Sequence, residues 1–194
     1  IAEAGGLYTA NEGSSIIFDA SSSTDPDGDV LQYRWDFEND GAWDTEWSSS
    51  PTASHTWNND WSGTAKVEVT DGEFTASDTA SVTVINVPPV ADDKLITTDE
   101  DTSIGITLTA SDPGSDTLTF SAISAPLNGI LSGTPPNLTY MPNPNWNGTD
   151  SFTYKAHDGV ADSNIATVTI NVNAVNDPPV CADDNAVTDE DTSV

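Results

Sequence analysis

Residues 65–70 read Ala-Lys-Val-Glu-Val-Thr, and this alternation of apolar and polar side chains is typical of a β-strand with one buried face. Similar runs rich in Val, Ile, Thr and aromatic residues occur at 81–87, 151–155 and 166–172. Residues rich in Gly, Pro, Asn and Asp separate these runs, and no stretch shows a helical apolar stripe with caps. The sequence therefore predicts an all-β fold.

A repeated segment divides the chain into blocks. The segment that runs from Pro88 to Ile104 returns from Pro178 to Val194, so that the Pro-Pro pairs are 90 residues apart. A period of this length corresponds to a whole small domain, and the last copy stops after its first strand. We expect two domains, 1–87 and 88–174, followed by 175–194 as a linker and the first strand of a truncated third repeat in a longer array.

The two complete blocks share one order of features. An apolar strand is followed by Asp25-Pro26 in the first block and by Asp112-Pro113 in the second, and a hairpin at Asp71-Gly72 or Asp158-Gly159 comes later. The Pro-Pro pairs cannot donate ladder hydrogen bonds, so they mark domain boundaries. We predict two tandem immunoglobulin-like β-sandwiches with Greek-key topology and about seven strands each, arranged end to end.

Composition excludes several classes of function. The 194 residues include 32 Asp and Glu against 4 Lys and Arg, for a formal net charge of −28. A nucleic-acid partner needs clustered basic residues, and membrane insertion needs an apolar run of about 20 residues, so we expect neither. The single Cys, at position 181, excludes a disulfide within the chain, and we interpret it as an isolated thiol.

The acidic residues are mostly of one kind, since 24 are Asp and 8 are Glu. The short Asp side chain suits turns and hard-cation sites, where several oxygens must converge on one point. A solvating acidic surface, as in halophilic proteins, is the alternative, but it would also recruit Glu. The excess of Asp favours bound cations.

The order and direction of the strands predict where these acidic residues lie in the fold. We label the seven predicted strands of each domain A to G in chain order. Because consecutive strands alternate in direction, the loop between strands B and C and the loop between strands F and G lie at the same end of the second domain, the end that faces the first domain. The A–B turn of the first domain, the residues before its strand F and the linker lie at the same junction. This junction gathers Glu12, Asn58, Asn59, Asp60, Asn86, Asp92, Asp93, Asp112, Asp116 and Asp158. So many carboxylates repel one another unless protons or a divalent cation intervene, and we predict Ca²⁺, which takes 6–8 oxygen ligands.

Related acidic clusters are expected at the two outer ends of the rod. The first domain contributes Asp25, Asp27, Asp29 and Asp71, and the second contributes Asp99, Glu100, Asp101, Asp150, Asp177 and Asp183. An ordinary polar turn is the alternative for any one of these loops. Their recurrence at equivalent places favours cation binding.

One further loop has the spacing of a calcium-binding loop. Asp36, Glu38, Asp40, Gly41 and Asp44 occupy positions 1, 3, 5, 6 and 9 of that pattern. Position 12, however, is Trp47 instead of a bidentate acid. An additional Ca²⁺ loop and a simple turn around residues 39–41 therefore both stay open.

Tryptophan is concentrated in the first domain. Trp35 lies in a strand and is expected in the core. Four others flank Gly, Ser and Asn, where exposed rings could stack on a sugar or polymer chain: Trp43, Trp47, Trp57 and Trp61. The alternative is that these rings shelter the rim of a small core.

Catalysis is not expected. His55 and His157 are the only histidines, and no nucleophile with a paired base is evident. Carboxylate pairs are so common in this chain that they do not indicate a glycosidase. We therefore expect a protein that is not an enzyme.

Residues 13–87 resemble a polycystic-kidney-disease (PKD) domain. The resemblance rests on Gly13 to Ala20, on the loop from Ser23 to Asp29, on Tyr33 to Phe37 and on Val67 to Gly72. The chain departs from the family at Glu38 to Asp44, where Gly-Asp-Gly usually follows the Phe.

Residues 88–174 resemble the cadherin-like tandem repeats of large bacterial surface and secreted proteins. The matching segments are Asp99 to Thr102, Asn143 to Tyr154 and Val175 to Pro179. The two resemblances together imply extracellular β-sandwich modules with spacer or accessory roles, and the second implies calcium at domain junctions.

We therefore expect a calcium-binding structural or adhesive module of a bacterial surface or secreted protein. Ca²⁺ at domain junctions would rigidify a multidomain stalk, and the partners would be neighbouring domains of the same long chain. The alternative is an accessory module of a secreted hydrolase that binds an insoluble polysaccharide or a surface protein.

Overall fold

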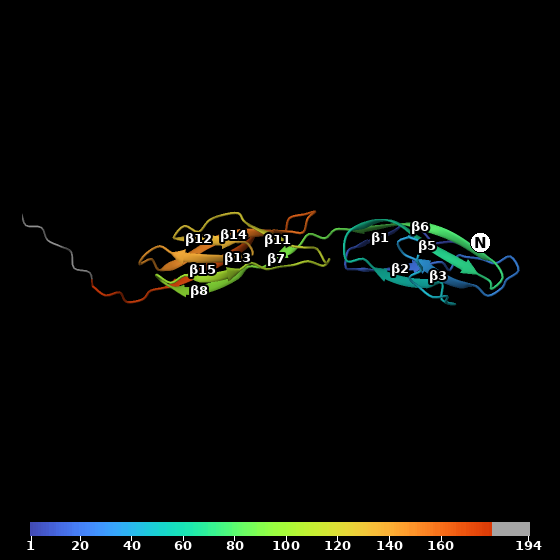
Figure 1. Cartoon of the computed structure of the whole chain (residues 1–194), viewed down its shortest axis with the longest axis horizontal. Coiled ribbons are helices and arrows are strands. Elements are labelled where there is room, and N and C mark those ends of the chain that lie inside the picture. Colours follow the sequence, from blue (N-terminus) through green and yellow to red (C-terminus); the bar gives the residue numbers. More distant parts are fainter. Residues whose placement is uncertain (180–194) are drawn as a thin grey trace, which may run out of the picture.

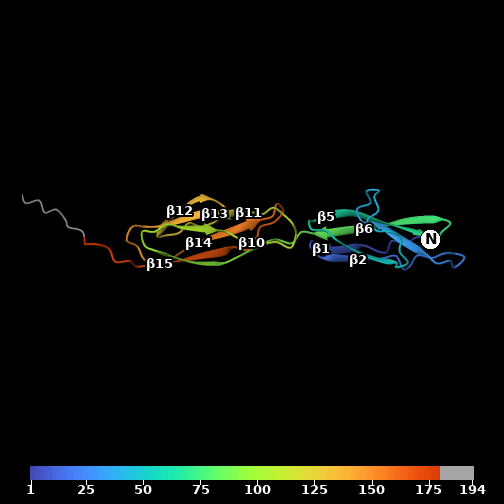
Figure 2. The same ribbon diagram turned by 60° about the horizontal axis from the view of Figure 1, so that its bottom comes forward.

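The structure is a computed structural model that describes residues 1–179. These residues form two β-sandwiches joined end to end in an elongated rod (Figures 1 and 2). They contain no helix, so no described helix crosses a membrane. The predicted strand of a third repeat, with Cys181 and Asp183, lies outside the described residues.

Domain 1 is a sandwich of six strands in two sheets. The larger sheet has the order β1-β6-β5-β3, with β1 parallel to β6, and the smaller sheet pairs β2 with β4. The strands are β1 (Tyr8–Asn11), β2 (Ser15–Asp19), β3 (Gln32–Asp36), β4 (Thr52–Thr56), β5 (Trp61–Thr70) and β6 (Thr75–Ile85).

The core of domain 1 is built on the alternation seen in the sequence. In β5 the side chains of Ala65, Val67 and Val69 are buried, and they face an aromatic cluster between the sheets. Phe18 on β2 packs against Trp35 on β3 with 5.3 Å between ring centroids. Full burial of an apolar side chain of this size contributes about 1.5–3 kcal/mol, so this cluster accounts for much of the stability of the domain.

Domain 2 contains nine strands, of which two, paired with each other, have only two residues each. Its sheets have the orders β11-β14-β15-β8, β12-β13-β9 and β10-β7, with β8 parallel to β15. The strands are β7 (Val90–Ala91), β8 (Lys94–Asp99), β9 (Ile104–Thr107), β10 (Ala110–Ser111), β11 (Thr119–Ala122), β12 (Gly129–Thr134), β13 (Asn137–Pro142), β14 (Gly148–His157) and β15 (Ala166–Asn173).

The strand count differs from the predicted seven in both domains. In domain 1, residues 37–51 form turns and bends, so one strand is missing. An isolated bridge between Tyr33 and Ser48 and hydrogen bonds to the Trp35 carbonyl join this segment to β3. In domain 2, the first two predicted strands are each divided into two shorter strands. The chain moves from one sheet to another between β7 and β8, and strand pairing is interrupted between β9 and β10. The runs predicted as strands lie in β5, β6, β14 and β15, although β6 ends at Ile85.

Asp150 on β14 is a polar residue of the domain 2 core, with 5% of its surface exposed. One carboxylate oxygen accepts from the N–H groups of Leu127 (3.0 Å) and Ser151 (2.9 Å). The other accepts from the N–H of Asn128 (2.8 Å) and the Tyr140 hydroxyl (3.0 Å). Both oxygens are therefore occupied within domain 2, where the sequence predicted a cation ligand.

These hydrogen bonds set the ionisation of Asp150. Burial alone would raise its pKa, but the three N–H donors and the Tyr140 hydroxyl outweigh burial and hold the pKa of Asp150 below its usual range. Burial and the same contact raise the pKa of Tyr140. The carboxylate thus stays charged and fixes the loop before β12.

Replacing Asp150 with Asn is expected to destabilise domain 2 by about 2–4 kcal/mol, because an amide group would face donors that need an acceptor. Since the folded-state pKa is lowered, the carboxylate's contribution is complete above the unfolded value of about 3.9 and is lost as pH falls through the folded-state pKa. Urea unfolding of the full chain at neutral pH and at acid pH measures both effects. Exposed Asp162→Asn is the control, with an expected loss below about 1 kcal/mol. Equal losses for the two variants would contradict the assignment.

Candidate metal centre at the domain junction

Four segments meet where the rod passes from domain 1 to domain 2 (Figure 1). Domain 1 supplies the turn between β1 and β2, which contains Glu12, and the turn between β4 and β5. Domain 2 supplies the loop between β10 and β11 and the turn after β14. The linker after β6 runs beside them, so the predicted loops lie at the junction.

Backbone contacts hold the two domain ends close together. The N–H of Ser115 in domain 2 donates to the carbonyl of Asn58 in domain 1 at 2.7 Å. Gly13 has φ of +69°, and a Cβ at this position would lie 2.4 Å from the carbonyl oxygen of Pro113. Only glycine permits both this backbone conformation and this approach, which explains the Glu-Gly pair at the turn.

Three carboxylates converge in the space between these loops: one oxygen each of Glu12, Asp112 and Asp116 lies within 4.8 Å of the others. Oε1 of Glu12 accepts from the N–H of Val87 at 2.8 Å, and Oδ1 of Asp112 accepts from the N–H of Gly114 at 2.8 Å. The remaining oxygens, Oε2 of Glu12 and Oδ2 of both aspartates, are buried without a hydrogen-bond partner. Buried polar atoms are rarely left in this state.

Asn86 on the linker adds a fourth unpartnered oxygen. Its side-chain amide donates to Oδ2 of Asp158 at 3.1 Å, and its own Oδ1 is buried without a donor. Oδ1 of Asp158 accepts from the N–H groups of Val160 (2.7 Å) and Ala161 (2.6 Å). Asp158 therefore caps its own turn and orients Asn86, a role that differs from the direct ligand predicted from the sequence.

Burial and the crowding of carboxylates change the pKa values at the junction. Burial raises the pKa of Glu12, and the nearby Asp116 and Asp112 raise it further against the lowering effect of the Val87 N–H. Burial also raises the pKa of Asp116, with contributions from Asp112, Asp158 and Asp60. Full ionisation of all the carboxylates in the cluster is therefore unfavourable without a neutralising cation.

The donor set defines what the junction could hold. Three carboxylate oxygens and one amide oxygen are hard ligands, and the cluster contains neither His nor Cys. Ca²⁺ takes 6–8 such oxygens at about 2.3–2.6 Å, with water completing the shell, whereas Zn²⁺ prefers nitrogen and sulfur. The residues present thus fit a calcium ion.

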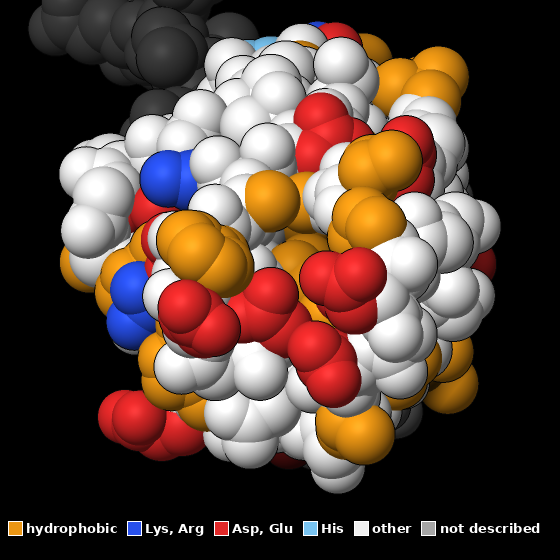
Figure 3. Space-filling view, turned by 90° about the vertical axis from the view of Figure 1, so that its right-hand side faces the viewer, with side chains coloured by type: hydrophobic (Ala, Val, Ile, Leu, Met, Phe, Trp, Pro, Cys, Tyr) orange, Lys and Arg blue, Asp and Glu red, His pale blue; other side chains and the backbone are white. Residues whose placement is uncertain are grey.

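Three of the acids predicted at the outer end of domain 1, Asp25, Asp27 and Asp71, line one hollow there, and Figure 3 shows acidic side chains gathered on this end. Oδ1 of Asp25 accepts from the N–H groups of Asp27 (2.8 Å) and Asp29 (3.2 Å). Oδ1 of Asp71 accepts from Glu73 (2.8 Å) and from Phe74 (2.7 Å), which lowers the pKa of Asp71. These carboxylates therefore cap their own loops.

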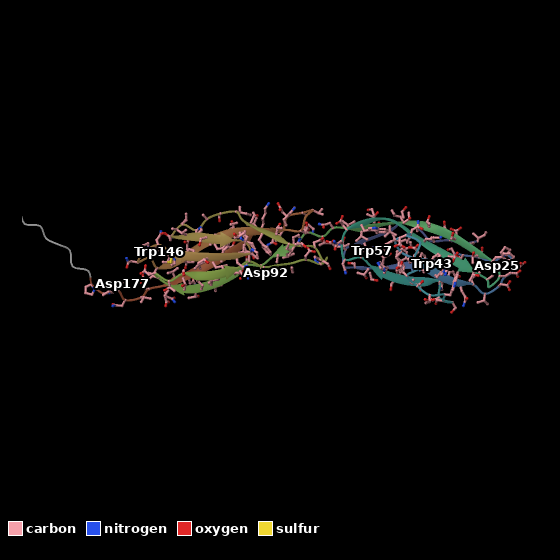
Figure 4. The ribbon with its side chains drawn as sticks, viewed as in Figure 1. Asp25, Trp43, Trp57, Asp92, Trp146 and Asp177 are labelled. Carbon is pink, nitrogen blue, oxygen red and sulfur yellow. The ribbon has the colours of Figure 1, made fainter. Side chains whose placement is uncertain are left out.

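Asp92 and Asp93 were predicted at the junction, but the structure places them inside domain 2 (Figure 4). Oδ2 of Asp92 accepts from the Thr109 hydroxyl at 2.6 Å, and Oδ1 of Asp93 accepts from the N–H of Thr167 at 2.7 Å. These hydrogen bonds join the first residues of domain 2 to other parts of the same domain. The chain has already entered domain 2 at β7, which precedes Asp92.

The acids predicted at the outer end of domain 2 are separately engaged. Glu100 accepts from the N–H of Val175 at 2.5 Å, Asp99 from the Asn173 amide at 2.9 Å, and Asp101 from the N–H of Asn145 at 3.0 Å. Asp177 lies on the exposed segment beyond the sandwich (Figure 4). Within residues 1–179, these acids form no group as close as the one at the junction.

The loop after β3 brings Asp36, Glu38 and Asp44 within 4.8 Å of one another, whereas Asp40 is outside this group. Both oxygens of Asp36 accept backbone hydrogen bonds, from Asp40 at 3.1 Å and from Gly41 at 2.9 Å. Asp44 accepts from Phe37 at 2.7 Å, and Glu38 lies 3.3 Å from Nε2 of His55. The hydrogen bonds cap a turn and the three carboxylates also converge, so a simple turn and an additional Ca²⁺ loop both fit this geometry.

The tryptophans divide into two groups. Trp57 is only 8% exposed in the core of domain 1, and Trp61 stacks on it with 5.0 Å between ring centroids, so neither forms a loop platform. Trp43 and Trp47 are partly exposed, but the Arg34 guanidinium lies over both rings at 4.1 and 4.5 Å. The rim-sheltering interpretation fits Trp57 and Trp61.

Solved structures share the sandwich architecture. The insect immune protein hemolin has 14% sequence identity and a TM-score of 0.50, over 88% of this chain and 46% of that one. An endo-fucoidan hydrolase from glycoside hydrolase family 107 has 21% identity and a TM-score of 0.39, over 88% of this chain and 28% of that one. The chain thus spans less than half the length of either protein. No curated protein matches it.

Family comparisons divide the chain at the junction. Residues 1–85 match the family described as PKD domain, and residues 86–171 match the family described as bacterial Ig domain. Both the predicted PKD domain and the bacterial tandem repeat after it are confirmed. The chain is therefore a PKD domain followed by a bacterial Ig domain.

Proposed function

We propose that this chain is a calcium-binding structural module in which Ca²⁺ at the junction fixes the two domains in line. The observation that carries the proposal is the set of four buried oxygens without hydrogen-bond partners, on Glu12, Asn86, Asp112 and Asp116. PKD and bacterial Ig domains are typical of extracellular bacterial proteins, where millimolar calcium can fill even weak sites.

Without a cation, the cluster of carboxylates is energetically unfavourable. Like charges a few ångströms apart in a partly dry interface repel by several kcal/mol, and each buried unpaired oxygen adds a desolvation cost. A divalent cation removes both costs, because it neutralises the charge and supplies each oxygen with a partner. Protons would neutralise the charge as well, but only at a pH near the raised pKa values.

Calcium fits this cluster better than other common cations. Mg²⁺ demands near-ideal octahedral geometry and keeps several waters, whereas Ca²⁺ accepts irregular sets of oxygens from flexible loops. Here the ligands come from both domains and from the linker, so their spacing is set by the packing of two sandwiches. A larger ion with adaptable geometry is favoured.

Rigidity is the functional consequence. Apart from this cluster, the Ser115–Asn58 backbone hydrogen bond joins the two ends. Domains joined in this way move relative to each other unless their interface is large and apolar. An ion bound by both sides and by Asn86 adds bonds that exist only in the aligned arrangement. The chain then serves as a stiff spacer or adhesive segment.

Calcium is expected to stabilise the chain and to straighten it. Binding to the folded, aligned form alone adds RT ln(1 + [Ca²⁺]/Kd) to the free energy of unfolding, about 2.7 kcal/mol at a hundredfold excess over Kd. Calorimetry with calcium or after metal removal, at constant ionic strength, measures the gain, and small-angle X-ray scattering measures the length distribution. Glu12→Gln should abolish both responses, whereas Glu73→Gln, an exposed acid in the β5–β6 turn, should retain them.

Sodium chloride separates this proposal from general screening of a very acidic protein. Screening would stabilise the wild type and Glu12→Gln alike, without selecting calcium. If added NaCl reproduced the calcium response at the same ionic strength, or if Glu12→Gln responded fully to calcium, the junction site would be wrong.

Acidification is expected to weaken calcium binding. Protons compete for Glu12 and Asp116, whose pKa values are raised, so the affinity should fall as pH decreases through those values. In metal-free protein the sign reverses: the folded state binds these protons more tightly, so stability rises as pH falls from neutral toward about 4. Calorimetric titrations at a series of pH values check the first effect, and thermal unfolding of metal-free protein checks the second. An affinity that does not change with pH would exclude these two carboxylates as ligands.

A further inference from the structure

Glycines lie on both sides of a backbone contact between the two domains. A Cβ at Gly13 of domain 1 would lie 2.4 Å from the carbonyl oxygen of Pro113. A Cβ at Gly114 of domain 2 would lie 2.7 Å from the carbonyl oxygen of Asn58. Both distances are shorter than a Cβ atom tolerates. The contact is therefore reciprocal, because each domain presents a backbone without a side chain to a carbonyl group of the other.

Gly114 also borders the proposed ion site. A Cβ there would lie 3.0 Å from Oδ1 of Asp112 and 3.0 Å from Oδ2 of Asp116. The second of these oxygens is buried and has no hydrogen-bond partner among the described residues. Two carboxylate oxygens of domain 2 and the Asn58 carbonyl oxygen of domain 1 thus surround the space beside Gly114. The separation of the domains at this point therefore affects the spacing of the oxygens in the cluster.

Both sides of the contact are anchored within their own domains. In domain 1, the N–H of Gly13 donates to the carbonyl of Trp57 at 2.8 Å, which joins the turn that contains Gly13 to the turn that contains Asn58. The Trp57 ring is itself buried in the domain 1 core. In domain 2, the N–H of Gly114 donates to Oδ1 of Asp112 at 2.8 Å. Because both loops are held in this way, an added side chain at the contact is expected to push the domains apart.

We propose that this glycine contact selects the size of the ion at the junction, with Gly114 as the positioning residue. The inference rests on the calcium site of the proposed function, whose carboxylates come from Glu12 on one side and from Asp112 and Asp116 on the other. Ca²⁺–oxygen distances cover only about 2.3–2.6 Å. Relieving the 2.7 Å approach at Gly114 requires a shift of about 0.5 Å or more, which is larger than that range. A wider junction would therefore hold Ca²⁺ poorly and fit a larger divalent ion, such as Sr²⁺, better.

Replacing Gly114 with Ala tests the contact from the domain 2 side. The φ of Gly114 lies outside the left-handed region, so Ala is compatible with its backbone. Within domain 2 the added methyl group would meet the ends of two carboxylate side chains, whereas across the junction it would meet the backbone of domain 1. The variant is therefore expected to fold like the wild type and to hold the domains further apart. Gly105→Ala, where no described atom lies within 4 Å of the Cβ, is the control.

Gly13→Ala tests the same contact from the domain 1 side and without touching a carboxylate, since the three atoms nearest to its Cβ all belong to Pro113. Ala at a φ of +69° is strained, so this variant also destabilises domain 1 by itself. Gly28→Ala carries a similar strain, with a φ of +81°, but the described residues place no atom within 4 Å of its Cβ. This control separates backbone strain from displacement of the domains.

Isothermal titration calorimetry of the full chain with Ca²⁺ and with Sr²⁺ gives the two dissociation constants, and urea unfolding of metal-free protein checks that each variant folds. We expect Gly114→Ala and Gly13→Ala to bind Ca²⁺ about tenfold more weakly or worse. The ratio of the Sr²⁺ to the Ca²⁺ dissociation constant should fall in both variants by about tenfold or more. Gly105→Ala and Gly28→Ala should retain the wild-type affinity and ratio.

The outcomes separate this proposal from the proposed function. A ratio that keeps its wild-type value in both variants would overturn the selection by size, because a loss of packing alone weakens the two ions equally. Unchanged calcium affinity in Gly114→Ala, or loss of both ions in both variants, would overturn it as well. These results leave the junction site of the proposed function intact. If the wild type and both controls failed to bind calcium, the junction site itself would be wrong.

Discussion

Repulsion between carboxylates at a small interface is the constraint on which this structure depends. The sandwich topology forces the loops of domain 2 that carry Asp112 and Asp116 against the turn that carries Glu12, and a backbone approach at Gly13 leaves no room to separate them. Glu12 and Asp112 each accept a backbone hydrogen bond with one oxygen, and Oε2 of Glu12 and Oδ2 of Asp112 and Asp116 are buried without a partner. Burial and this crowding raise the pKa values of Glu12 and Asp116.

Much of this arrangement could be predicted from the sequence, because it depends on the order and direction of the strands more than on individual side-chain contacts. Alternating strand direction alone places the loops with Asp112 and Asp116 beside the turn with Glu12. The predicted positions that differ from the structure concern residues whose place depends on where a strand begins or ends. Asp92 lies only a few residues beyond the linker, but β7 has already entered domain 2 at that point. Trp57 follows the last residue of β4, and its ring turns into the core, a direction that its loop-like neighbours Asn58 and Asn59 did not suggest.

Other features required the three-dimensional structure. The hydrogen bond from Val87 to Glu12 joins residues 75 positions apart, and neither residue type predicts it. Asp158 appeared equivalent to Asp112 in the sequence, yet it caps its turn and holds the Asn86 amide, leaving the amide oxygen as the free acceptor. The Glu-Gly pair at positions 12–13 was the available signal of close contact, since a positive φ at Gly13 commonly accompanies a tight approach.

The excess of aspartate over glutamate has two separate causes in this chain, and only one concerns cations. Asp19, Asp25, Asp71 and Asp158 accept backbone hydrogen bonds from residues a few positions later, a role for which the short side chain is suited. Such capping satisfies the carboxylate locally and explains many of the acids without a ligand. Glutamate has the longer reach: Oε1 of Glu12 accepts a hydrogen bond from the linker, and its carboxylate also lies beside those of Asp112 and Asp116. The composition therefore indicates turns, and what distinguishes the proposed site from these caps is its set of buried oxygens without hydrogen-bond partners.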